Sequence, residues 1–178
     1  MTRLRAILVL LTLVQLGCAG YVHFGEASSD SSRARIFRRV AVVSHLADFN
    51  TVFSNEFAKE VVSAFSKHGV EAHVTIVSPL NLDPGAQVEQ IMSFAPDAVL
   101  VVRQTKGAVE YDEHGKTGEA GWFVARLHED INLEKAIWAA EFSVSISDMF
   151  NSPRKTGRRA AQKLVDELAK AGFVSAEI

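Results

Sequence analysis

Residues 40–77 read VAVVSHLADFNTVFSNEFAKEVVSAFSKHGVEAHVTIV, and this stretch decides the fold. Its first seven residues are rich in β-branched side chains, which predicts a buried strand. Gly69 is a typical helix end, and residues 70–77 alternate as a second strand. Between the strands, helical spacing predicts a helix over 50–68, whose inward face is Phe53, Phe57, Val61, Ala64 and Phe65. A strand, a helix and a strand in this order indicate parallel strands joined by a right-handed crossover.

The rest of the chain continues this pattern. Asp83 with Pro84, and later Ser152 with Pro153, are typical starts of two further helices. The element order is β-α-β-α-β-β-β-α, and the predicted fold class is α/β. We expect a mixed five-stranded sheet with three helices packed on it, leaving part of one face or an edge open. The three remaining strands are expected over 97–111, 121–128 and 135–147.

The first seventeen residues differ in composition from the rest. Arg3 and Arg5 precede an apolar run of eleven residues, AILVLLTLVQL, and small residues follow it. A charged start, a short apolar core and a small-residue exit are typical of a secretory signal peptide. The run is also shorter than the roughly twenty residues that span a bilayer. Residues 1–17 are therefore predicted to be a signal peptide.

A signal peptide that ends in Gly17 and Cys18 resembles the lipobox of bacterial lipoproteins. The resemblance implies that the peptide is cut before Cys18 and that this cysteine carries acyl chains such as palmitate. Several chains anchor a protein stably, whereas one does so only marginally. Ala19 and Gly20 follow the cysteine, and by resemblance to the family's sorting rule we expect a lipid-anchored protein at the periplasmic face of the outer membrane. The alternative is an ordinary signal peptide cut after Ala19 or Gly20.

Residues 18–38 are expected to be the lipid anchor and a flexible Ser-rich tether, followed by a single α/β domain over 39–178. The stretch SSDSS at 28–32 has no periodic apolar pattern. Arginines gather around residues 36–37, and we interpret them as a solvated lead-in to the first strand. The alternative for this cluster is contact with anionic headgroups or a partner.

Composition excludes several classes of function. The formal net charge is −2 and the sequence pI is about 6.3, so no broad basic surface for nucleic acid is expected. A single cysteine excludes an intramolecular disulfide and a multi-thiolate metal site. We therefore expect a globular domain without a nucleic-acid partner.

No motif for catalysis or nucleotide binding is complete. Gly115-Lys116-Thr117 resembles the end of a P-loop, but Glu110 stands where the loop needs its first glycine. The surrounding residues 111–121 are polar and glycine-rich, and we interpret them as a hairpin tip. The six histidines show no metal-ligand spacing, although the oxygen ligands around the tip leave a weak cation site as an alternative. We expect no cofactor, no metal and no enzymatic activity.

Two tryptophans have different expected roles. Trp138 belongs to an apolar strand face and is predicted to be core. Trp122 shares its face with Arg126 on a mixed strand, and tryptophan and arginine are favoured as binding anchors. The alternative is that Trp122 covers a helix edge. The predicted partner-binding residues are Trp122, Arg126, Tyr111 and His114.

The element order, in a small lipoprotein, resembles the TolB amino-terminal domain and the penicillin-binding-protein activator lipoproteins. The residues that carry this resemblance are VAVVS at 40–44, PDAVLVV at 96–102 and the tryptophan strand KAIWAAEFSVSI at 135–146. The resemblance implies a binding module that contacts a protein of the cell envelope, in its assembly or regulation. The alternative is a small-ligand-binding or hydrolytic periplasmic domain that uses His45 and Asp48 after the first strand.

Overall fold

The computed structural model describes residues 22–30, 32, 35–78, 80, 83–147 and 152–176. Cys18 and the predicted signal peptide lie outside these residues. The elements in chain order are β1 (Val22–Ser29), β2 (Arg39–His45), α2 (Thr51–Lys67), β3 (Glu71–Ile76), α3 (Pro84–Phe94), β4 (Ala98–Asp112), β5 (Gly115–His128), β6 (Ala136–Ser147) and α4 (Pro153–Lys170). None of the described helices is both long and apolar enough to cross a bilayer.

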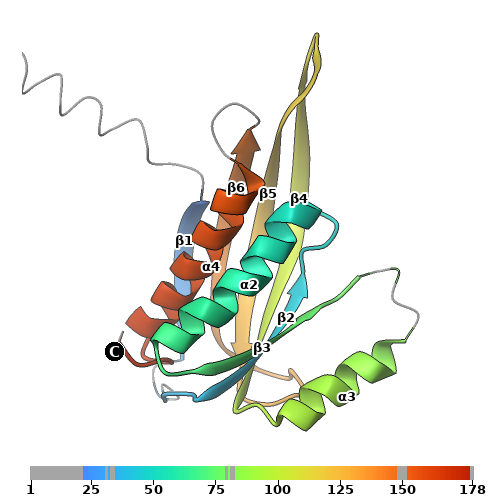
Figure 1. Cartoon of the computed structure of the whole chain (residues 1–178). Helices are drawn as coiled ribbons and strands as arrows, with labels where there is room; N and C mark the ends of the chain where they lie inside the picture. The colour runs from blue at the N-terminus through green and yellow to red at the C-terminus, as the bar shows by residue number, and fades with distance from the viewer. Residues whose placement is uncertain are drawn as a thin grey trace, which may run out of the picture.

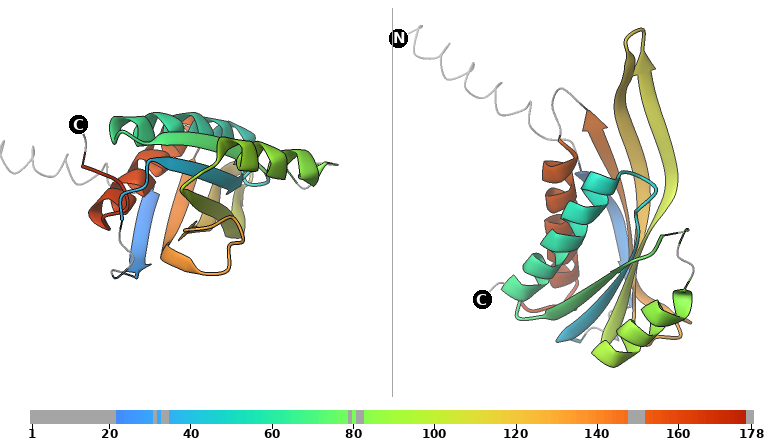
Figure 2. Two further views of the ribbon diagram at one scale, coloured as in Figure 1. Left: turned by 90° about the horizontal axis from the view of Figure 1, so that it is seen from below. Right: turned by 45° about the vertical axis from the view of Figure 1, so that its right-hand side comes forward.

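The sheet has six strands in the order β1-β6-β5-β4-β2-β3. β2 is parallel to β3 and to β4, as the two crossovers require, and the other neighbours are antiparallel. Helices α2 and α4 lie side by side across one face, and α3 lies on the other face, at the end of the molecule opposite to the projecting tip of β4 and β5 (Figures 1 and 2). The α/β class with three helices is therefore confirmed.

The predicted number of five strands was wrong, because the serine-rich segment contains a sixth strand. β1 (Val22–Ser29) pairs antiparallel with β6 at the edge of the sheet. Most of its side chains are exposed, and only Val22 is fully buried. The ring of Phe24 stacks on Phe142 with centroids 4.9 Å apart. Hydrogen bonding to β6, rather than an apolar pattern of its own, makes this segment a strand, so hydrophobic periodicity could not show it.

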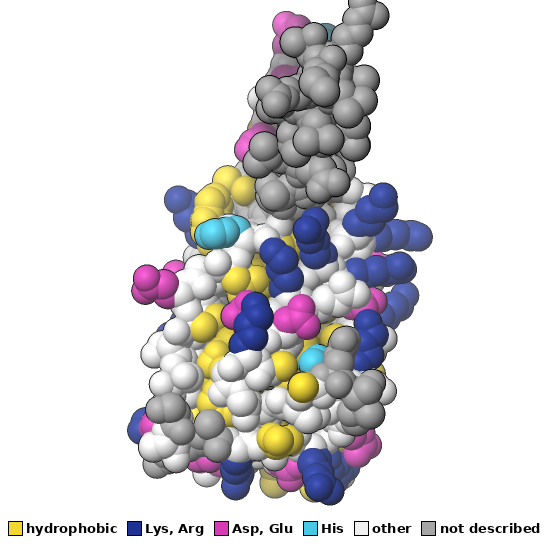
Figure 3. Space-filling model, turned by 90° about the vertical axis from the view of Figure 1, so that its left-hand side faces the viewer, with side chains coloured by type: hydrophobic (Ala, Val, Ile, Leu, Met, Phe, Trp, Pro, Cys, Tyr) yellow, Lys and Arg dark blue, Asp and Glu magenta, His cyan; other side chains and the backbone are white. Residues whose placement is uncertain are grey.

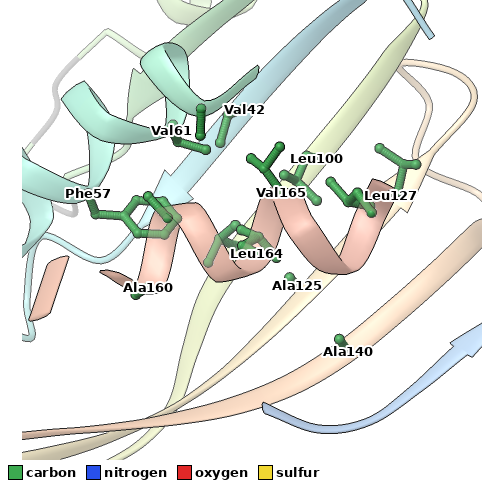
Figure 4. Packing of buried hydrophobic residues seen from close by; sticks show 14 of the residues in the cluster. Val42, Phe57, Val61, Leu100, Ala125, Leu127, Ala140, Ala160, Leu164 and Val165 are labelled. Carbon is green, nitrogen blue, oxygen red and sulfur yellow. The ribbon is translucent and has the colours of Figure 1, made fainter. Parts of the chain in front are cut away.

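The main core lies between the sheet and the pair α2 and α4. In Figure 4 Phe57 and Val61 from α2 and Leu164 and Val165 from α4 are seen with the inward side chains of the strands. The two helices approach closely at Gly157, where a Cβ atom would stand 2.6 Å from the carbonyl oxygen of Phe53. Trp138 is 1% exposed, so its predicted place in the core is confirmed.

The helix ends follow their sequence signals. Asp83 accepts a hydrogen bond from the Ala86 N–H, and Ser152 accepts one from the Lys155 N–H, so both serve as N-caps. Gly69 has φ 69°, and the Val70 N–H donates to the Phe65 carbonyl oxygen, which closes the end of α2 as predicted. These caps fix the residues at which the three helices begin or end.

Candidate functional site

The second face of the sheet is covered only in part. Its small apolar cluster joins α3 to β2 and β4 through Ile91, Ala41 and Val99. Further along, between β4, β5, β6 and β1, no described helix covers the strands (Figure 2). We call this surface the open face. A shallow hollow of about 580 Å³ lies in it, and its lining is Glu26, Ala27, Ser28, Val124, Arg126, Ala139, Ala140 and Glu141.

Trp122 and Arg126 lie on the open face. The side chains of Trp122, Val124 and Arg126 point the same way because alternate residues of a strand share a face. Trp122 is 39% exposed, and the Lys106 Nζ lies 5.0 Å from the centroid of its ring, a cation–π contact. A flat aromatic group and a guanidinium thus stand on one exposed strand surface.

The hollow carries charges of both signs. Arg126 stands on β5, Glu141 on the neighbouring β6 and Glu26 on the edge strand β1. Because the rest of the lining is small or neutral, the hollow offers polar contacts on a flat floor and no deep cavity. A flat surface of this kind fits a protein partner better than it fits a small molecule, because small-molecule ligands are usually enclosed by their pockets.

Tyr111 and His114 lie elsewhere, at the tip of the long hairpin formed by β4 and β5. We call the part of this hairpin beyond Gln104 and Phe123 the arm; β6 pairs with β5 as far as Gly118, and the end of the arm beyond that residue projects past the rest of the sheet (Figure 1). Tyr111 is 72% exposed, and the His114 N–H donates to the Asp112 carboxylate in the turn. Trp122 is about 20 Å from the tip along the strand. The four predicted binding residues therefore form two separate groups, on the open face and at the tip.

The predicted hairpin is confirmed, and it is longer than expected because β5 begins at Gly115 rather than near residue 121. Its acidic side chains do not converge: Glu119 is 8% exposed, turns away from the tip and accepts hydrogen bonds from Asn50 Nδ2 and Lys116 Nζ. This contact ties the arm to the start of α2. Within the described residues, no three His, Cys, Asp or Glu side chains gather as a metal site.

Asp48 lies in the loop after β2, as predicted, whereas His45 is the last residue of that strand and not part of the loop. They line a second hollow of about 580 Å³ together with Arg103, Gln104, Lys106 and other residues of β4. Burial lowers the pKa of the His45 imidazole, and the positive charge of Arg103 lowers this pKa further. A His with a lowered pKa is neutral at pH 7 and can accept a proton.

An apolar pocket of about 280 Å³ lies between α3, the sheet and the loop before β6. Its lining is Val43, His45, Thr75, Val77, Gln87, Val88, Ile91, Val99, Ile131 and Leu133. Leu133 has φ 58°, a left-handed conformation that a leucine rarely adopts, and its N–H donates to the Asp130 side chain. Thr75 is 5% exposed, and its hydroxyl has no hydrogen-bond partner among the described residues.

Sequence reasoning missed three of these features. Lys106 lies beside Trp122 because the two residues are opposite each other in β4 and β5, and this neighbourhood can be known only from the register of the two strands. Glu26 and Ser28 reach the open face because β1 is a strand. The pocket depends on the course of residues 129–135, where the sequence carries no periodic signal. In each case the missing information is long-range pairing.

Basic side chains gather on the flank formed by α4 and β1, as the view onto this side shows (Figure 3). Lys155, Arg159 and Lys163 are four residues apart along α4 and so lie on one side of the helix. The Lys163 Nζ donates to the Val22 carbonyl oxygen at 2.8 Å, which places this stripe beside the first residue of β1. We call these three residues the basic stripe.

No protein-family model matches the chain, and no curated protein matches it. Among solved structures, the chain is similar to a PelC dodecamer from Paraburkholderia phytofirmans, with 13% identity, a TM-score of 0.54, and 85% of this chain and 98% of the PelC chain covered. The chain has the fold of PelC. A second PelC structure from the same organism, carrying a point substitution, gives 13% identity, a TM-score of 0.51 and coverage of 86% and 99%. A lipoprotein of Neisseria meningitidis, GNA1162, overlaps more loosely, with 15% identity, a TM-score of 0.45 and coverage of 75% and 99%.

Proposed function

We propose that this protein is a lipid-anchored binding module of the bacterial envelope, which holds a protein partner on its open face. The observation that carries this proposal is the exposed group of Trp122, Lys106 and Arg126 on a sheet surface that no described helix covers. Tryptophan and arginine are the residues most enriched at interface hot spots. A large aromatic ring is otherwise favoured in the core, as Trp138 shows in the same chain.

The anchor is part of this proposal. Cys18 follows a signal-like segment, and its acyl chains would hold the domain at the periplasmic face of the outer membrane. Tethering raises the effective concentration of the module near envelope proteins, so that a weak interface suffices. The resemblance of the sequence to the TolB amino-terminal domain and to penicillin-binding-protein activators supports this kind of partner, one that belongs to the machinery of the envelope.

The test is in-cell crosslinking of the tagged full-length chain, followed by mass spectrometry of the proteins captured. We expect one recurrent envelope protein, lost in Trp122→Ala and retained in His45→Ala, with the Trp122→Ala chain still folded and present at the normal level. Trp138→Ala is the matched control, because it removes the same side chain from the core and should cost about 3–5 kcal/mol of stability. Capture of the same partner by Trp122→Ala at undiminished yield would contradict the proposal.

A second candidate function is favoured by the apolar pocket beside α3. Small-molecule sites are mostly apolar, with a few polar groups that fix orientation. Here the polar groups are the unpartnered Thr75 hydroxyl and His45. Leu133, held in its unusual conformation by Asp130, forms part of the wall. This arrangement suits a short aliphatic ligand with one polar group.

Calorimetric titration with decanoate tests this second function. Leu133→Asn should weaken binding at least tenfold, since asparagine tolerates the left-handed conformation and removes the apolar wall. Val62→Asn, an exposed position on α2 outside the pocket, should bind as the parent does. Absence of heat with the parent chain, or equal affinities for the two variants, would argue against an aliphatic ligand.

A further inference from the structure

The edge of β4 is unpaired along the arm. β2 pairs with β4 only as far as His45 and Arg103, and beyond Arg103 the only described neighbour of β4 is β5. The N–H and C=O groups on the other side of β4 therefore have no strand partner over residues 104–112, although the Gln104 side-chain amide donates a hydrogen bond to the Lys106 carbonyl oxygen. A long free edge of this kind is a template for pairing with another strand.

The space beside this edge is open. After His45 the chain leaves the plane of the sheet and enters α2, and Phe49 packs on Phe53 and Phe123. Two hollows follow the edge, one of about 580 Å³ that reaches Gly107 and one of about 320 Å³ that reaches Val109. Asp48 and residues of β4 line both hollows, and the smaller one also extends over Lys116, Glu119 and Ala120 of β5. A strand added at this edge would continue the line in which β2 ends.

The regular part of the edge begins after a bulge in β4. The pairing of β4 with β5 shifts register between Gln104 and Lys106, and again between Glu110 and Tyr111. The first shift leaves Thr105 of β4 unpaired and twists this strand, whereas the second leaves Thr117 of β5 unpaired, so that β4 itself continues to Asp112. The segment of continuous pairing between the two shifts is Lys106–Glu110, with the sequence KGAVE and Ala108 at its centre.

We propose that a second copy of this chain pairs antiparallel with this segment, with the two-fold axis at Ala108. In this register Lys106 of each copy lies opposite Glu110 of the other, and Gly107 lies opposite Val109. Opposite charges directly across an antiparallel pair are stabilising. The segment is thus complementary to itself, which is what an interface formed by the same patch on both copies requires.

Two-fold symmetry excludes most other registers. In an antiparallel pair, two residues that lie opposite each other either both point their N–H and C=O groups toward the partner strand or both point them away. The two-fold axis therefore has to pass through a residue that lies opposite its own copy. An axis at Gly107 would place Lys106 opposite Ala108. An axis at Val109 would place Glu110 opposite Ala108 and Lys106 opposite Asp112, whose carboxylate already accepts a hydrogen bond from the His114 N–H in the turn. Only an axis at Ala108 places Lys106 opposite Glu110.

The side chains on the two faces also fit this register. Lys106 and Glu110 are four residues apart and share the face of Trp122, so their charges meet on one side of the joined sheet. On the other side Val109, which is 48% exposed, would lie over Gly107 of the second copy. The Gln104 amide lies over this glycine, with its Nε2 2.6 Å from where a Cβ would stand, so this flexible side chain has to move aside for the valine to pack there. The apolar side chain is thereby covered.

The rest of each molecule stays clear of the contact. Because the arms run antiparallel, each folded body lies beyond the tip of the other arm. The two six-stranded sheets join edge to edge, and the open faces remain accessible. Lys106 also contacts the ring of Trp122, so variants of Glu110, which lies four residues further along the arm, test this contact separately from partner binding.

Sedimentation of the full-length chain in a non-ionic detergent tests the pairing by exchange of charges. We expect a concentration-dependent dimer for the parent chain and at least a tenfold higher dissociation constant for Lys106→Glu and for Glu110→Lys alone. An equimolar mixture of these two variants, and the double variant Lys106→Glu/Glu110→Lys, should regain the affinity of the parent. Recovery of the parent affinity in these two experiments would be specific to the proposed register, since the only thing that each of them restores is opposite charges at positions 106 and 110 across the axis.

Crosslinking through introduced cysteines tests the axis itself. Ala108→Cys places two thiols about 5 Å apart, so a short thiol-reactive crosslinker should join the copies. Thr105→Cys is the matched control on the same exposed strand, because its two copies would lie about 20 Å apart. Cys18 is present in both variants and so cannot produce a difference between them.

A monomer at every concentration would overturn the proposal. So would a larger assembly that is indifferent to both charge reversals, or equal crosslinking at positions 105 and 108. Loss of the envelope partner in Trp122→Ala with the dimer intact would support both proposals. Loss of the dimer in Glu110→Lys with the partner retained would show that the arm acts separately, because Glu110 is not in contact with Trp122.

Discussion

His128 is a buried histidine at the end of β5, with 6% of its surface exposed. Burial lowers the pKa of its imidazole because the charged form loses its hydration, and the nearby charge of Arg126 lowers the pKa further. A hydrogen bond with the backbone of Lys135 and the charge of Asp130 partly offset this shift. The folded protein therefore holds His128 neutral at a pH where the unfolded chain binds a proton.

This imbalance predicts a stability that falls in mild acid. The unfolded pKa is near 6.5 and the folded pKa is lower, so the unfolded state binds more protons as the pH drops below about 6.5. We expect the free energy of unfolding to decrease from pH 7.5 to pH 5.0, and His128→Gln to make this decrease smaller. Urea denaturation at four pH values measures it. His114→Gln, at the exposed arm tip, is the control, and an equal slope in parent and His128→Gln would contradict the assignment.

At the scale of single residues, the sequence predicts well which side chains are buried. It predicts poorly which side chains contact one another. Trp138 and Trp122 could be told apart by the residues that alternate with them, because alternation reports which face of a strand is apolar. The neighbours of Trp122 could not be found in this way. Lys106 is sixteen residues away in sequence, and the register that joins them depends on a bulge at Thr105.

The elements with strong local signals were placed correctly, and the one without such signals was missed. The helices begin at Asp83 and Ser152 caps, and α2 ends before Gly69, since these side chains act on backbone groups only a few residues away. β1 has no comparable signal. Its serines and Glu26 are exposed, and β6 supplies its hydrogen bonds from more than a hundred residues away.

Gly157 in α4 leads to a prediction that is opposite to helix propensity. Alanine is favoured over glycine in a helix by about 0.5–1 kcal/mol. At Gly157, however, a Cβ would stand 2.6 Å from the Phe53 carbonyl oxygen and 3.1 Å from the Phe57 backbone nitrogen. Backbone atoms of α2 cannot move aside singly, so the two helices must separate. We expect Gly157→Ala to destabilise the fold by about 1–3 kcal/mol, as overpacking does.

Thermal unfolding compares this variant with Gly85→Ala in α3. There the added Cβ meets only one side-chain atom, the capping oxygen of Asp83 at 3.3 Å, and a shift of a few tenths of an ångström relieves this contact, so alanine should be neutral or slightly stabilising. A rise in the melting temperature for both variants would show that α2 and α4 are not in close contact at this point.

The helices cover the two faces of the sheet unequally. Two helices bury one face of the sheet along its length, whereas α3 covers only one end of the other (Figure 2). The sequence predicted that a face or an edge would stay open, because three helices are too few to cover both faces. It could not show which strands are exposed, since that depends on the order β1-β6-β5-β4-β2-β3.

The start of β1 changes the expected position of the domain relative to the membrane. Only residues 19–21 separate Cys18 from Val22, a reach of at most about 14 Å when fully extended. A lipid at Cys18 would thus hold the flank of β1 and α4 against the bilayer, and this flank carries the basic stripe of Lys155, Arg159 and Lys163. A lysine in the first turn of a helix opposes the helix dipole, and α4 has no acidic residue there. Attraction to anionic headgroups would account for this lysine.

A chain that begins at Ala19 contains the whole described fold and allows this attraction to be measured without the anchor. We expect it to bind phosphatidylcholine vesicles with 30% phosphatidylglycerol at low salt, and to be released at 0.5 M salt, where charges are screened. Each basic residue near an anionic surface contributes about 1 kcal/mol, so Lys155→Glu/Arg159→Glu should weaken binding at least tenfold. Lys59→Glu/Lys67→Glu on α2 changes the net charge equally on another surface and should bind as the parent does. Equal weakening by both pairs would mean that net charge, and not the flank beside β1, faces the membrane.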